Sequence, residues 1–243
     1  IGSNVTSIGV RAFASCSALI SITINDSVQS IGGWAFAECS ELRTFAVPNS
    51  VKSIGEGIFF DCSRLKSVSI GNGILSIEEC SFFGCIELSS ISIGSSVISI
   101  GVHAFVNCSG LISISIPSSV QSIAEGAFYI CSGLSNVIIH GSIQTIDVDA
   151  FNGCTSLTTF TIGDDVTSIK DRAFLDCSSL KEIIIPDNVI SIGTQVFMGC
   201  YGLTTIHIGN GVTSIGSSAF SHCSKLTYIA IPNSVTCIGN CSF

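Results

Sequence analysis

The stretch VISIGVHAFVNCSGLISISI, residues 97–116, decides the fold, because every part of the chain repeats its pattern. Phenylalanine recurs every 23 residues, cysteine follows it three positions later, and leucine follows the cysteine after three more. No insertion or deletion shifts this register, so the chain consists of about ten and a half copies of one unit. A fixed period of this size is the signature of a repeat architecture. The phenylalanines stand at positions 13, 36, 59, 82, 105, 128, 151, 174, 197, 220 and 243.

The repeat predicts a single solenoid over residues 1–243, with no second domain and no linker. One turn cannot bury its own apolar side chains, whereas a stack of turns places each apolar residue above its copy in the turn below. Neither end carries a unit with a polar outer face, so the sequence predicts an uncapped solenoid. We therefore expect the chain to be a fragment of a longer protein.

The end of each unit, L-x-x-I-x-I, is typical of a β-strand because apolar and polar residues alternate. Ile22 and Ile24, for example, are expected to point inward while Thr23 points outward. Pro, Gly, Asn or His follows each strand and turns the chain. Successive strands then stack into a parallel sheet. The segment A-F-x-x-C, with apolar residues at i, i+1 and i+4, predicts a short helical turn or irregular structure on the opposite wall.

The unit I-G-x-x-A-F-x-x-C-x-x-L resembles the BspA-like leucine-rich repeat family, also called the Treponema pallidum type. Its clearest copies lie at 99–108 and 214–223, and the resemblance covers the whole chain. It implies a leucine-rich repeat solenoid of 23-residue units with the parallel β-sheet on a concave face. It also implies a cell-surface or secreted protein that binds or adheres to a protein or glycan. The family has no catalytic residues to carry over, so the resemblance implies no enzyme.

Composition and charge exclude several function classes. Apolar residues make up 47% of the chain and charged residues 11%, which suits a packed core. Nine Lys and Arg against 17 Asp and Glu give a formal net charge of −8, so no nucleic-acid partner is expected. No apolar run approaches the roughly 18 residues that a membrane span requires, so we expect no membrane insertion. No signal-peptide pattern stands at the start of the sequence.

The 13 cysteines and four histidines invite a search for reactive or metal sites. Ten cysteines, from Cys16 to Cys223, share one column beside Phe and Leu, and we expect them to pack as small apolar residues. Disulfides between neighbouring turns are the alternative. A straight ladder does not supply converging ligands, so no metal and no cofactor is predicted. The histidines are scattered and lack a carboxylate and a nucleophile nearby, so no catalytic residue is predicted.

The outward columns of the predicted strands consist mostly of small hydroxyl residues. Binding hot spots are usually Trp, Tyr and Arg, so the middle of this face is poor in them. The richest cluster lies in the last three turns, where the register brings residues of adjacent strands together. A smaller basic spot lies in two adjacent turns near the start. The predicted partner-binding residues are thus Lys181, Glu182, Thr205, His207 and Tyr228, with Arg43 and Lys66 as the basic spot.

Two other functions stay open alongside binding and adhesion. Uncapped ends expose apolar layers and strand edges, which favours end-to-end association into a fibre or surface layer. That hypothesis predicts concentration-dependent filaments. The regular Ser and Thr array would instead suit a surface that orders water or ice. That hypothesis predicts inhibited ice growth, which bulky substitutions of Ser92 and Thr161 should reduce.

Overall fold

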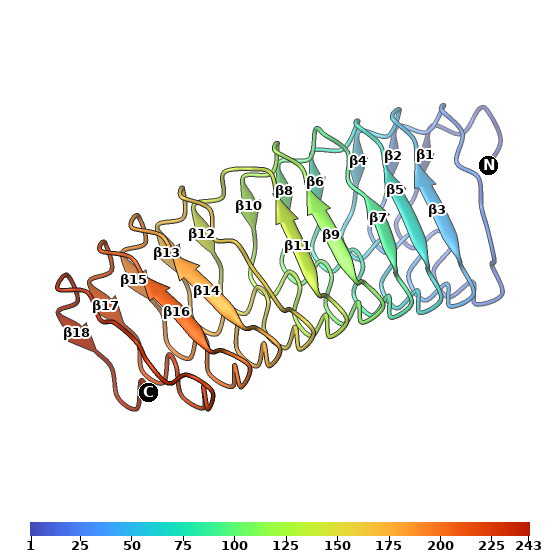
Figure 1. Cartoon of the computed structure of the whole chain (residues 1–243). Helices are drawn as coiled ribbons and strands as arrows, with labels where there is room; N and C mark the ends of the chain where they lie inside the picture. Colours follow the sequence, from blue (N-terminus) through green and yellow to red (C-terminus); the bar gives the residue numbers. More distant parts are fainter.

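The computed structural model describes residues 1–243, which wind into an elongated stack of turns from one end of the chain to the other (Figure 1). All strand pairing is parallel, and each strand pairs with its copy one repeat away. Ser7 pairs with Ser30, and Thr44 with Ser67. These pairs are 23 residues apart, so the predicted solenoid of 23-residue units is confirmed.

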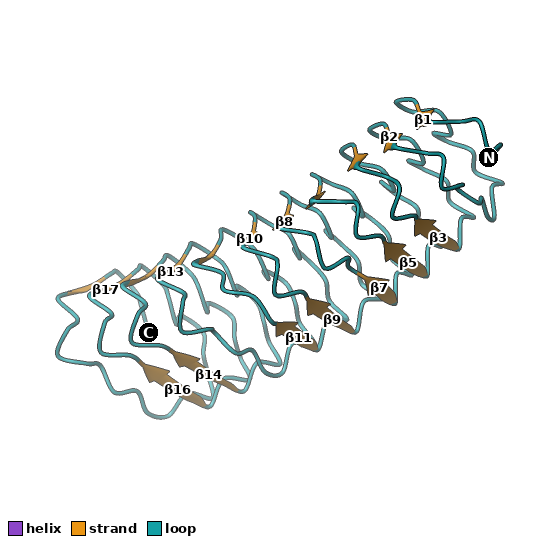
Figure 2. Ribbon diagram, turned by 90° about the horizontal axis from the view of Figure 1, so that it is seen from above, coloured by secondary structure: helices purple, strands orange, loops and turns teal.

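The longer strands line one side of the molecule, which we call the strand face (Figure 2). They form three separate sheets in the orders β3-β5-β7, β11-β9 and β14-β16. Alternate residues are apolar and point inward, as predicted, and the residues between them point outward and are mostly polar, with Ala46, Ile138 and Ile184 as the apolar exceptions. These strands are β3 (Thr44–Val47), β5 (Ser67–Ile70), β7 (Ser90–Ser92), β9 (Ser113–Ile116), β11 (Asn136–Ile139), β14 (Glu182–Ile185) and β16 (Thr205–Ile208).

A second ladder of two-residue strands runs along the other long edge (Figure 2), and the sequence did not predict it. It is divided into the sheets β1-β2-β4, β10-β8-β6 and β12-β13-β15-β17-β18. Each strand combines a Ser, Thr or Cys with a following isoleucine. They are β1 (Ser7–Ile8), β2 (Ser30–Ile31), β4 (Ser53–Ile54), β6 (Ser76–Ile77), β8 (Ser99–Ile100), β10 (Ser122–Ile123), β12 (Thr145–Ile146), β13 (Ser168–Ile169), β15 (Ser191–Ile192), β17 (Ser214–Ile215) and β18 (Cys237–Ile238).

The A-F-x-x-C segments form the back wall, opposite the strand face, and they contain no helix. The expectation of a short helical turn there is wrong, whereas the alternative of irregular structure is confirmed. The residues two before and two after each repeating phenylalanine have positive φ, such as Trp34 and Glu38 at 59°. Alternate N–H groups then donate to the next turn, as from Phe36 to the Ile58 carbonyl at 3.0 Å. These bonds between turns replace the bonds that a helix would make.

The core is one continuous column between the two faces. The repeating phenylalanines stack along it with ring centroids 5.0 to 6.0 Å apart, and we call them the Phe ladder. Nine of the ten cysteines of the repeating column, from Cys39 to Cys223, are buried beside it as predicted, whereas Cys16 in the first turn is exposed, because no preceding turn covers it. All 13 cysteines of the chain are free thiols. Each buried thiol also donates to a phenylalanine carbonyl of the preceding turn, as from Cys62 to Phe36 at 3.0 Å.

Both strand ladders are interrupted together at one junction between turns, which we call the seam. No backbone hydrogen bond joins β11 to residues 159–162 on the strand face, and none joins β10 to β12 on the other edge. On the back wall the bonds across the same junction persist, with Phe128 donating to the Ala150 carbonyl at 2.9 Å. The turns are therefore tied at the back and open at the front.

Candidate binding face

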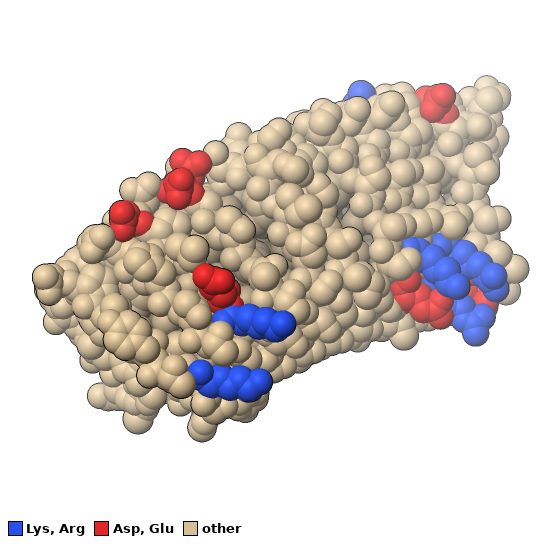
Figure 3. All heavy atoms as spheres, in the orientation of Figure 1, with Lys and Arg blue, Asp and Glu red and all other residues tan.

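Charge is unevenly distributed over the strand face. Charged side chains gather toward its two ends, and the middle, over β7, β9 and β11, carries none (Figure 3). The middle instead presents hydroxyl residues together with isolated aliphatic side chains, of which Ile112 and Ile138 are exposed. Any charge-based recognition on this face must therefore occur near its ends.

The structure brings most of the predicted cluster of the last three turns together. Glu182 pairs in register with Thr205, and Ile184 pairs with His207, so these four residues form a two-by-two patch on β14 and β16. Lys181 lies immediately before β14, where its carbonyl accepts a bond from the Thr204 hydroxyl at 3.1 Å. All of these side chains except that of Thr204, whose hydroxyl is bonded, stand free of hydrogen bonds and ion pairs within the chain.

Tyr228 lies one turn beyond this patch, in a segment that forms no strand. Its side chain is the most exposed of the large apolar residues, at 77%. It therefore extends the patch toward the end of the face.

Arg43 and Lys66 occupy adjacent turns, as predicted, since Lys66 donates its N–H to the Arg43 carbonyl at 2.8 Å. Their surroundings are mixed in charge and not simply basic. Lys66 Nζ lies 3.6 Å from Glu87 Oε2, and Arg64 pairs nearby with Glu41 at 2.7 Å. Both ion pairs are solvent-exposed, and such pairs attract only weakly. Arg43 keeps the only unpaired basic group of this spot.

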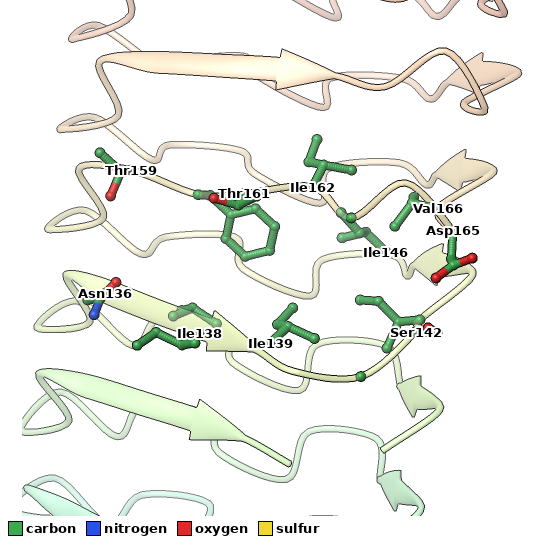
Figure 4. A pocket seen from close by; sticks show the side chains of 15 residues that line it. Asn136, Ile138, Ile139, Ser142, Ile146, Thr159, Thr161, Ile162, Asp165 and Val166 are labelled. Carbon is green, nitrogen blue, oxygen red and sulfur yellow. The ribbon is translucent and has the colours of Figure 1, made fainter. Parts of the chain in front are cut away.

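Two clefts flank the extended segment 159–162 at the seam, and sequence analysis missed both. The first, of about 340 Å³, lies between β11 and this segment and is lined both by apolar residues such as Ile139 and by polar residues such as Thr161 and Asp165 (Figure 4). The second, of about 420 Å³, lies on the other side, toward Glu182 and Ile184 of β14. Because Glu182 belongs to both the second cleft and the two-by-two patch, cleft and patch form one surface.

The segment between these clefts keeps only one link to the sheet, an isolated bridge from Thr159 to Glu182. The ring of Phe160 anchors this segment to the core, because it lies 4.9 Å from both Phe151 and Phe174 and is wedged between two rungs of the Phe ladder. The sequence signal was the phenylalanine itself, which stands where most other turns have isoleucine or valine.

One contact on the strand face has the residue types of a catalytic pair. Ser115 Oγ lies 3.0 Å from His140 Nε2. Both residues are exposed, and no carboxylate contacts the other ring nitrogen. A histidine that activates a serine is normally oriented by such a third group, so the pair lacks the geometry of a nucleophilic site.

The structure contains no grouping of three or more His, Cys, Asp or Glu side chains that could hold a metal ion. It also contains no helix with the length and apolarity of a membrane span.

Comparison with known proteins gives a consistent relationship. A family model described as the BspA type leucine rich repeat region matches residues 1–111, 64–181 and 167–243, and so covers the chain. The crystal structure of a leucine-rich repeat protein from Bacteroides ovatus is 25% identical with a TM-score of 0.62, over 96% of this chain and 82% of that one. A leucine rich cell surface protein from Faecalibacterium prausnitzii is 28% identical with a TM-score of 0.59, over 96% and 73%. The search of curated proteins found no match.

Proposed function

The chain belongs to the BspA-type leucine-rich repeat family, and from this premise we propose that it is a non-catalytic binding or adhesion module at a cell surface or in secreted form. Its strand face engages a protein or glycan partner. The similarity to a leucine rich cell surface protein supports the location, and the rigid stack of turns supports binding through an extended preformed surface.

The observation that carries this proposal is the junction of the second cleft with the patch on β14 and β16. The cleft is lined by Ile162 and Ile184 together with polar residues such as Thr161, and the patch beside it offers charged and hydrogen-bonding groups at Glu182 and His207. A concave surface that combines apolar side chains with a few polar groups is the common arrangement of a binding site. The exposed Tyr228 adds an aromatic side chain of the kind that dominates binding energy.

A binding screen on arrayed glycans and extracellular-matrix proteins tests the proposal. The native chain is compared with a triple variant, Lys181→Ala, His207→Ala and Tyr228→Ala. A matched control truncates three exposed residues in the middle of the same face, Ser69→Ala, Ser92→Ala and Ser113→Ala. We expect a ligand whose signal falls at least tenfold in the first variant and less than twofold in the control.

Other outcomes would contradict the proposal in different ways. A ligand that both variants bind as the native chain does would place binding elsewhere on the molecule. The absence of any ligand for the native chain would instead favour the structural alternative, in which solenoids associate end to end, and electron microscopy for filaments would then be the next measurement.

A further inference from the structure

The back wall of the early turns carries a cluster of half-buried aromatic side chains outside the Phe ladder. Trp34, which is the only tryptophan, lies with its ring centroid 5.1 Å from that of Phe60. Phe60 in turn stacks on Phe83, with centroids 4.8 Å apart and planes inclined by 12°. Three successive turns thus contribute one ring each to a continuous apolar surface on the side opposite the strand face.

The indole of Trp34 is held in a fixed position. A side chain at Gly57 would approach its ring to 2.6 Å, so the indole lies against the glycine backbone of the next turn. Its Nε1–H donates to Glu56 Oε1 at 3.3 Å. The guanidinium of Arg11 lies over the same indole, 6.0 Å from the ring centroid. This internal contact shows that the ring accepts a cation, because the face of an aromatic ring attracts positive charge.

Four exposed carboxylates flank these rings. Glu56 and Glu79 are copies of each other in adjacent turns on one side, and Glu38 and Asp61 are copies on the other. None of them takes part in the three ion pairs of the structure. Burial and then the neighbouring Glu38 raise the pKa of Asp61, and burial followed by Glu79 and Glu56 raises the pKa of Cys80. These shifts place Glu38 near Asp61, and Glu56 and Glu79 near Cys80, and no basic side chain forms an ion pair with any of the four carboxylates.

We propose that this surface, formed by Trp34, Phe60, Phe83 and the four flanking carboxylates, docks an extended basic segment of a partner protein. Lysine and arginine side chains combine an apolar stem with a cationic head, so they can cover the rings and reach the carboxylates at once. Successive rings lie about 5 Å apart along the solenoid, so the three rings extend over about 10 Å. Side chains on one face of an extended peptide recur about every 7 Å, so two such side chains can cover the three rings. A partner bound here leaves the strand face free.

Trp34 itself provides the test, because its fluorescence is the only tryptophan signal of the chain. Acetylated decalysine is titrated into the protein, with decaglutamate as the peptide control. The test variant removes the four charges and keeps their oxygen acceptors, through Glu38→Gln, Glu56→Gln, Asp61→Asn and Glu79→Gln. The matched variant removes four exposed charges elsewhere, through Asp26→Asn, Glu125→Gln, Asp164→Asn and Asp165→Asn.

Decalysine is expected to change the Trp34 emission with saturation, while decaglutamate leaves it unchanged. The dissociation constant should rise at least tenfold in the test variant and less than twofold in the matched variant. Equal weakening in both variants would reveal attraction to overall negative charge only and would overturn the proposal. Failure of decalysine to bind, or saturable binding that leaves the Trp34 emission unchanged, would overturn it as well.

A Trp34→Leu variant separates the role of the ring from that of the carboxylates. Its binding is followed by the anisotropy of fluorescein-labelled decalysine, and circular dichroism checks that the repeat fold is retained. We expect a several-fold weaker affinity, because leucine keeps only part of the apolar side chain and the aromatic face is lost. Unchanged affinity would contradict the proposed contribution of the aromatic cluster.

Discussion

At the residue scale, the repeating cysteine does more than fill space. Cys177 is fully buried and its thiol donates to the Phe151 carbonyl of the preceding turn at 3.2 Å. Cys177→Ala leaves that carbonyl without this donor and opens a small cavity, so we expect a loss of about 1–2 kcal/mol in the free energy of unfolding. Cys16→Ala removes an exposed thiol and should change it by less than about 0.5 kcal/mol. Urea unfolding measures both changes. Equal losses would show that the burial and hydrogen bond of the Cys177 thiol do not contribute to the free energy of unfolding.

Because the thiols are buried, the free energy of unfolding should fall at alkaline pH. Burial raises the pKa of Cys39 and Cys223 to about 11 from the ordinary thiol value of 9.0. Between these values the unfolded chain releases thiol protons that the folded chain keeps, so the free energy of unfolding falls as pH rises. The stabilising contribution of these two thiols is complete below pH 9.0, the pKa in the unfolded chain. It is lost as the pH rises past about 11, the pKa in the folded chain.

We therefore expect the thermal midpoint to fall between about pH 8 and about pH 11. The double variant Cys39→Ala and Cys223→Ala should show a shallower decline, since it lacks two of the titrating thiols. Differential scanning calorimetry across this range provides the measurement. A decline as steep as that of the native chain would exclude these thiols as its cause.

Glycine shows where sequence reasoning at this scale succeeded and where it could not. The glycine after the repeated isoleucine, as at Gly9, is replaced by Glu78 and Lys170 in other turns, and this variation by itself predicts that the position does not need positive φ. The structure confirms this. Positive φ occurs instead two residues before and after each ladder phenylalanine, at residues as different as Trp34 and Ile130. Because contacts between turns impose it there, residue type does not reveal it.

At the scale of the element, stacking should make the middle rungs of the Phe ladder matter most. Phe128 is fully buried, with Phe105 and Phe151 at 5.1 and 5.3 Å on either side. Phe128→Ala should therefore cost roughly 3–5 kcal/mol. Phe13 is less buried and has only Phe36 beside it, so Phe13→Ala should cost less. Guanidinium unfolding of both variants tests this, and equal losses would contradict a ladder in which each ring is stabilised from both sides.

The second strand ladder could not be predicted because its strands are too short to show a period. Ser30 and Ile31 form a complete strand of two residues, whereas alternation needs at least four to be recognised. The helical turn expected in the back wall was wrong for a related reason. Apolar residues at i, i+1 and i+4 fit a helical turn, and they fit equally well a non-helical turn that is hydrogen-bonded to the neighbouring turns. The period therefore predicted which residues stack and not which hydrogen bonds they make.

At the scale of the whole molecule, the repeat register predicted which residues of the candidate site are neighbours, but it did not predict the clefts. Register alone placed Glu182 beside Thr205, and the structure agrees. The clefts arise where the register holds but the pairing fails, and a repeat pattern contains no signal for such a failure. The only sequence feature that accompanies such a failure of pairing is a residue larger than its copies in other turns. A close-packed column cannot take up added volume without displacing its neighbours.

The turn after the seam carries two such residues. Ile143 stands in a column of valines, and Phe160 in a column of isoleucine and valine. The same substitutions occur earlier, and each coincides with lost pairing. Ile74 lies where β4 and β6 are unpaired, and Phe45 lies in the turn after residues 20–24, which form no strand. Nothing in the side chains explains the break between β7 and β9. Parallel pairing needs a spacing of about 4.8 Å. The Phe45 ring is wedged between Phe36 and Phe59, and β3 still pairs with β5 of the next turn, so the pairing that is lost beside an oversized residue is the pairing with the preceding turn.

The seam should consequently be the weakest point of the stack, and its cause can be removed. Backbone amides of residues 159–162 should exchange with solvent faster than those of β14, because only one bridge links them to the sheet. Phe160→Ile combined with Ile143→Val should allow β11 to pair with this segment and slow its exchange, although core volume is lost. Hydrogen exchange followed by mass spectrometry measures both.

Ile206→Val serves as the control for this prediction. It also reduces core volume, but in a part of the ladder that is already paired, so it should not slow the exchange of residues 159–162. If the double variant exchanges as fast as the native chain, oversized residues are not what holds the front of the solenoid open.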